Sequence, residues 1–67
     1  MKNINQIKVF KKSKVSEALK KMSAGGIKIV LVVNDKDNLI GTLSDGDIRR
    51  GLLNGLDLDS TIETIVF

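Results

Sequence analysis

The chain has 67 residues and a net charge of +3, and it contains no cysteine and no histidine. Without these residues it has neither disulfides nor a His/Cys zinc site, and it lacks the side chains that most often act as base or nucleophile at neutral pH. Its lysines gather in the first half without aromatic residues between them to stack bases, so a solvated basic surface is favoured over a nucleic-acid surface.

The first part of the chain predicts a strand and a helix. The alternation of Ile4, Ile7 and Val9 indicates a short strand. Ser13 is the expected N-cap of the helix, and the two glycines at 25–26 end it, because glycine tolerates the left-handed backbone of a C-cap. The helix has one apolar stripe with i, i+3, i+4 and i+7 spacing, which consists of Val15, Ala18, Leu19 and Met22.

The next segment predicts a β-hairpin. Residues 29–33 are an unbroken aliphatic run, mostly β-branched, which is typical of a strand buried on both faces. Residues 34–38 are turn formers, and residues 39–43 return as a second strand. Asp35 begins a pattern like that of a calcium-binding loop, but Gly46 stands where a bidentate glutamate is required, so that site is excluded.

A second helix is expected over residues 47–53. Ser44 is its predicted N-cap, and Asp47 lies in its first turn, where a negative charge interacts favourably with the helix dipole. An Asn-Gly pair at residues 54–55 is the predicted end of the helix. The residues expected to face inward are Ile48, Leu52 and Leu53.

The last part of the chain carries a second capping signature, Ser60-x-x-Glu63, which predicts a short helical turn. The apolar residues of that turn are Ile62, Ile65 and Val66. Because the sequence stops on the apolar pair at 66–67, we expect residues 1–67 to be one module of a longer protein.

The predicted elements follow in the order β-α-β-β-α, an α+β arrangement in which both helices cover one face of a small sheet. The other face of the sheet then needs a cover, and the aliphatic core of a 67-residue domain is marginal. We therefore expect the chain to associate with a copy of itself or with a partner domain. No apolar run is long enough to span a membrane and no signal peptide is evident. The absence of cysteine fits a cytoplasmic location, which we expect for this chain.

The candidate functional site is the transition from the second strand of the hairpin to the second helix. A strand that ends at Ser44, with Asp47 one turn into the helix, presents free backbone N–H groups that suit a phosphate. The Asp47 carboxylate can accept hydrogen bonds from sugar hydroxyls. Helix capping alone is the other interpretation of Ser44-x-x-Asp47, and the two roles are compatible.

This transition resembles the nucleotide-binding motif of CBS (cystathionine-β-synthase-type) regulatory modules, in which glycine, Ser or Thr, and Asp follow at three-residue spacing. Gly41, Ser44 and Asp47 fit that motif without a gap. The resemblance implies that Ser44 contacts the phosphate of AMP, ADP or ATP, that Asp47 binds the ribose hydroxyls, and that Gly41 keeps the backbone unobstructed. Lys28 and Arg49 are candidates for offsetting the phosphate charge.

The resemblance covers about residues 4–60, and residues 41–53 are similar to the first CBS motif ahead of some bacterial sugar-phosphate nucleotidyltransferase domains. It implies a regulatory module with no catalytic residue and no metal of its own, which forms one half of a CBS pair. The implied partner is a second CBS motif or, in a homodimer, a second copy of the chain. A dimerisation or docking module without a ligand is the alternative function.

Overall fold

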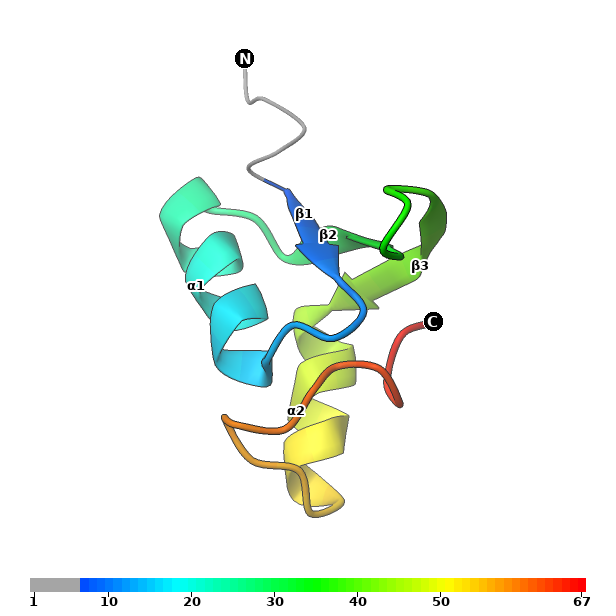
Figure 1. Ribbon diagram of the computed structural model, residues 1–67. Helices are drawn as coiled ribbons and strands as arrows, with labels where there is room; N and C mark the ends of the chain where they lie inside the picture. The colour runs from blue at the N-terminus through cyan, green and yellow to red at the C-terminus, as the bar shows by residue number, and fades with distance from the viewer. Residues whose placement is uncertain (1–6) are drawn as a thin grey trace.

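The computed structural model describes residues 7–67, and Figure 1 shows their arrangement. The predicted β-α-β-β-α order and the α+β class are confirmed. The contribution of Ile4 to the first strand lies outside the described residues. The elements are β1 (Lys8–Phe10), α1 (Val15–Gly25), β2 (Ile29–Val33), β3 (Leu39–Ser44) and α2 (Asp45–Leu53).

The described strands form one sheet in the order β1-β2-β3. β1 runs parallel to β2 because α1 carries the chain back between them, and β3 is antiparallel to β2, as expected of a hairpin. Asn34 closes the hairpin turn, because its side-chain oxygen accepts hydrogen bonds from the backbone N–H groups of Lys36 and Asn38 at 2.9 and 3.0 Å. The predicted hairpin is therefore confirmed.

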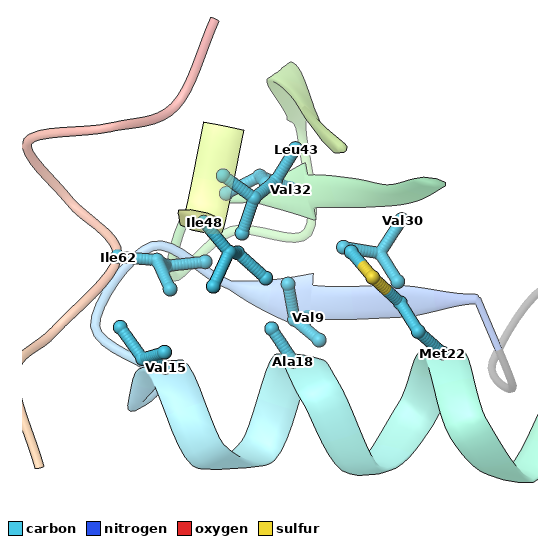
Figure 2. Close-up of a cluster of buried hydrophobic side chains, with 9 residues drawn as sticks. All are labelled: Val9, Val15, Ala18, Met22, Val30, Val32, Leu43, Ile48 and Ile62. Carbon is cyan, nitrogen blue, oxygen red and sulfur yellow. The ribbon is translucent and has the colours of Figure 1, made fainter. Parts of the chain in front are cut away.

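One face of the sheet packs against both helices, and this contact is the core of the molecule (Figure 2). Strand pairing sets Val9 beside Val32 and Val30 beside Leu43, so these four side chains point to the same side of the sheet. The prediction that both helices cover one face is confirmed. The complete cluster consists of Val9, Val15, Ala18, Met22, Val30, Val32, Leu43, Ile48 and Ile62.

The opposite face of the sheet, here called the open face, is covered only in part, which corrects in part the expectation that residues 29–33 are buried on both sides. Ile29 is 51% exposed, and Phe10, which lies on the same face, is 50% exposed. Both helices lie on the other side of the sheet, so the outward side chain of Ile29 has no helix above it, whereas Val33 at the opposite end of β2 is only 5% exposed.

The inward face of α2 consists of Ile48 and Gly51, which corrects the expectation for Leu52 and Leu53. Ile48 is buried, whereas Leu53 is 79% exposed and Leu52 is only partly covered. Gly51 faces inward because its missing side chain admits the following segment: a Cβ built on it would stand 3.0 Å from Leu56 Cδ1.

The N-cap of α1 is Lys14, which corrects the assignment of Ser13. The Ser13 hydroxyl accepts a hydrogen bond from the Phe10 N–H at 3.1 Å, so it holds the turn between β1 and α1 instead. The C-terminal ends of both helices lie where the sequence predicts them, whereas α2 begins at Asp45, two residues before the expected start. Gly26 caps α1 with a φ of 62°, and Asn54 caps α2.

Residues 56–67, here called the tail, run beside α2, and of the predicted helical turn they form a single turn at residues 63–65 without a helix (Figure 1). The Ser60 hydroxyl accepts from the Asp57 N–H at 3.0 Å, so it closes a turn that precedes the expected helix rather than starting one. Ile62 is fully buried, and its N–H donates to the Ser13 carbonyl at 2.9 Å. Within the tail the Ile65 N–H donates to the Ile62 carbonyl at 3.0 Å, which closes one turn, but no helix follows because Ile62 and Phe67 pair with distant backbone groups.

The end of the tail continues the sheet at the edge of β3. The Phe67 N–H donates to the Thr42 carbonyl at 2.9 Å, and the Thr42 N–H donates to the Phe67 carbonyl at 3.2 Å. This reciprocal pair satisfies backbone groups that an edge strand would otherwise leave free.

Candidate functional site

Ser44 and Asp47 hold each other at the point where β3 becomes α2. The Asp47 N–H donates to the Ser44 hydroxyl oxygen at 3.1 Å, and the Ser44 N–H donates to Asp47 Oδ2 at 2.9 Å. The Ser44 hydroxyl also donates to that carboxylate oxygen at 2.9 Å. These reciprocal bonds form a capping box, which confirms Ser44 as the N-cap of α2.

The neighbours of the Asp47 carboxylate favour its charged form. The backbone N–H of Ser44 is the main cause that lowers the pKa of Asp47, and the Ser44 hydroxyl and the Arg50 guanidinium lower it further, while partial burial opposes them. Arg50 Nη2 donates to Oδ1, the carboxylate oxygen to which Ser44 does not donate. Asp47 is therefore a fixed anion near the start of the helix.

A hollow of about 520 Å³ lies beside this carboxylate, between α2 and the tail. The Asp47 side chain is 14% exposed and forms part of the wall, so its carboxyl group is not sealed inside an internal contact. The wall combines charged groups with apolar side chains. Its members are Asp47, Arg50, Gly51, Asn54, Leu56, Thr64, Ile65, Val66 and Phe67.

Gly41 lies where the end of the tail meets β3. A Cβ built on Gly41 would stand 2.5 Å from the Phe67 carbonyl oxygen and 2.6 Å from Val66 Cγ1, far closer than van der Waals contact allows. The glycine therefore admits the tail to the sheet edge. Since Val66 and Phe67 also line the hollow, Gly41 shapes the candidate site through the tail.

Lys28 and Arg49, the two cations selected from the sequence, adjoin the start of α2 but are not among the residues that line the hollow. The Lys28 carbonyl accepts from the Asp45 N–H at 3.0 Å, and its side chain is exposed. Arg49 Nη2 lies 3.4 Å from Asp45 Oδ2. The structure thus joins Ser44 with Asp47 and leaves these two cations nearby.

Arg50 and the tail are the parts of this region that sequence reasoning missed. Arg50 contacts Asp47 and lines the hollow, whereas its neighbour Arg49 does neither. The i, i+3 spacing of Asp47 and Arg50 on one helix face was the available signal. The tail offered no comparable signal, because its partners in β3 and α2 are distant in the sequence.

Residues 2–54 match the family described as CBS domain. The chain belongs to the CBS domain family. An uncharacterized protein of Helicobacter pylori (strain J99) is 47% identical to it over 47 residues, which make up 70% of this chain and 14% of that protein. This CBS domain therefore spans a small part of the length of that relative.

Solved structures share the fold of this CBS domain. An uncharacterized conserved protein from Pyrococcus horikoshii is similar with a TM-score of 0.80 and 31% identity, over 91% of this chain and 47% of that one. The CBS domain protein PAE2072 from Pyrobaculum aerophilum, solved in complex with AMP, has a TM-score of 0.80 at 14% identity, over 98% of this chain and 56% of that one. At 14% identity the likeness concerns the fold alone.

CBS domains are generally regulatory rather than catalytic, and the groups around this hollow suit binding. Asp47 supplies an acceptor, Arg50 supplies a cation, and Leu56 and Ile65 supply an apolar surface. Within residues 7–67, acidic side chains do not gather in a group of three or more that could hold a metal ion. No helix in the described part of the chain has both the length and the apolar character needed to cross a membrane.

Proposed function

We propose that this CBS domain is a regulatory module that binds an adenine nucleotide, AMP, ADP or ATP, in the hollow beside α2. The observation that carries the proposal is the position of the Asp47 carboxylate, which belongs to the α2 capping box and borders the hollow. In the proposed complex Asp47 accepts hydrogen bonds from the ribose hydroxyls, and Ser44 lies at the phosphate, near the positive end of the helix dipole. The AMP complex of PAE2072 supports the proposal at the level of the fold.

The remaining residues of the proposed site supply charge and shape. Arg50 is the cation in the wall of the hollow. Lys28 and Arg49 add positive potential at the same end of α2, where it favours the approach of an anion. Gly41 contributes through the tail, because its bare backbone lets the tail form the wall that faces α2.

Regulation is proposed to act through pairing with a second CBS motif, in the same protein or in another copy of the chain. A nucleotide that binds one arrangement of the pair more tightly shifts the population toward it, by a coupling free energy that is typically about 1–3 kcal/mol. We propose that a cytoplasmic sugar-phosphate nucleotidyltransferase domain responds to this shift. The support for that domain is the resemblance of residues 41–53.

Isothermal calorimetry with AMP, ADP and ATP tests the site. We expect the wild type to bind at least one of them and Asp47→Ala to lose about tenfold or more in affinity, because a hydrogen bond to a charged group contributes about 1.5–3 kcal/mol. Asp45→Ala is the matched control, since Asp45 also lies in the first turn of α2 but outside the wall of the hollow. Equal affinities for the wild type and Asp47→Ala would falsify the assignment of Asp47 to the ribose.

A docking module without a ligand is the second candidate function. The observation that favours it is the open face of the sheet, where Phe10 and Ile29 leave about half of their surface in water. Exposed apolar surface is a feature of protein–protein contacts when it forms a contiguous patch. This role is compatible with nucleotide binding, because the open face and the hollow involve different residues.

A further inference from the structure

Both oxygens of the Asp47 carboxylate have partners within the chain. Ser44 donates to Oδ2 from its N–H and from its hydroxyl, and Arg50 Nη2 donates to Oδ1. The two bonds from Ser44 belong to the cap of α2, so they persist as long as the helix does. Oδ1 is therefore the oxygen that a ligand in the hollow would take over, and Arg50 is the group with which the ligand would compete.

Arg50 is placed to exchange its partner. Its side chain is 68% exposed and lines the hollow, and ion pairs that face solvent are weak enough to break readily. The guanidinium also lies over the first turn of α2, since a Cβ built on Gly46 would stand 3.6 Å from Arg50 Nη1 and 3.7 Å from Ser44 Oγ. One cation therefore adjoins both the carboxylate of Asp47 and the helix end that attracts an anion.

We propose that Arg50 makes the site selective for phosphorylated ligands, because it gives up Asp47 Oδ1 in exchange for an anionic group of the ligand. This role rests on the proposed nucleotide site and adds a means of discrimination to it. A nucleoside brings hydroxyls to Asp47 but offers no new partner to the displaced guanidinium. A nucleoside monophosphate brings hydroxyls to Asp47 and a phosphate to the displaced guanidinium, whose planar fork suits phosphate oxygens.

Parallel calorimetric titrations of AMP and adenosine test this role in the wild type and in Arg50→Gln. We expect the wild type to prefer AMP, and we expect the substitution to reduce the ratio of AMP to adenosine affinity by about tenfold, as for the loss of one charge-assisted bond. The affinity for adenosine should stay the same or rise, because Asp47 Oδ1 is released. Arg49→Gln is the matched comparison: it removes the same charge from the neighbouring position, where the side chain pairs with Asp45 and contributes only general positive potential, so it should lower the ratio much less than Arg50→Gln.

Three results would overturn the role of Arg50 while leaving the proposed function standing. They are equal losses of AMP and adenosine affinity in Arg50→Gln, equal binding of both ligands by the wild type, and the same fall in the ratio in Arg49→Gln. A wild type that binds neither AMP nor any other adenine nucleotide overturns the proposed function and this role together, so the two failures are distinguishable. Thermal unfolding of both variants checks that the fold persists, which we expect because both arginine side chains are exposed.

Discussion

Asp47 serves the helix and the proposed site with the same carboxylate. Oδ2 completes the capping box with Ser44, and Oδ1 lies in the ion pair with Arg50. Because Asp47 borders the hollow, Oδ2 stabilises the helix, while Oδ1 is available to exchange Arg50 for a ligand. This division explains why the capping interpretation and the binding interpretation of Ser44-x-x-Asp47 are compatible at the level of individual atoms.

Acid should destabilise the fold through Asp47. The folded-state pKa of Asp47 lies below the ordinary value of about 3.9, so its stabilisation is complete above that value and is lost as the pH falls through the folded-state pKa. We expect the free energy of unfolding of the wild type to fall more steeply below about pH 4 than that of Asp47→Asn, which has no proton to gain. Urea unfolding at a series of pH values between about 2.5 and 6 measures how the free energy of unfolding depends on pH in the wild type and in Asp47→Asn. Asp45→Asn should keep the steep wild-type slope, and a wild-type slope no steeper than that of Asp47→Asn would contradict the expectation.

The tail forms one wall of the hollow, and α2 forms the other. It is held near its middle by the buried side chain of Ile62 and at its end by the backbone pair of Phe67 with Thr42. Two glycines make room for it, Gly41 on β3 and Gly51 on α2. Small residues therefore appear on both elements where the tail crosses them.

Gly41→Ala should displace the end of the tail. The added methyl group would overlap the Phe67 carbonyl oxygen and Val66 Cγ1, and overpacking of this kind typically costs about 1–3 kcal/mol. We expect a lower melting temperature and faster hydrogen exchange of the Thr42 amide, which bonds to Phe67. Gly46→Ala is the control, since the nearest atoms to its added Cβ are at an ordinary 3.6 and 3.7 Å. Unchanged protection of the Thr42 amide in Gly41→Ala would show that the tail is not held there.

At the scale of the whole molecule, the sheet has one covered face and one open face. The covered face and both helices form a single aliphatic core, as Figure 2 shows. The open face carries Phe10 and Ile29, which are apolar and about half exposed. A small domain with this asymmetry gains stability when a second sheet covers the open face.

We expect the protein to self-associate through the open face of the sheet. Phe10→Lys should raise the dissociation constant of the dimer by about tenfold or more, because truncating a central aromatic residue of an interface commonly costs more than 1 kcal/mol. Leu53→Lys is the control, since Leu53 is also apolar and exposed but lies on α2. Analytical ultracentrifugation over a range of concentrations measures the dissociation constant of the dimer for the wild type and for both variants. A wild type that stays monomeric at high micromolar concentration would count against self-association and against the docking function.

Local features of the sequence were sufficient to predict the order of the elements and the capping box at the centre of the candidate site. The apolar stripe of α1, the hairpin turn at Asn34 and the cap at Ser44 all depend on residues no more than about two helical turns apart, so their spacing could be interpreted directly. The resemblance of the segment from Gly41 to Asp47 placed the site at the start of α2 for the same reason.

Contacts between distant segments settled the remaining features. Which face of β2 is open depends on where both helices pack, and the path of the tail depends on partners such as Ser13 and Thr42 far back in the chain. The choice of Arg50 over Arg49 as the cation at the hollow depends on the side of α2 that the tail faces. Sequence spacing specifies short-range hydrogen bonds and periodicity, whereas a hollow exists only between elements that tertiary packing has brought together.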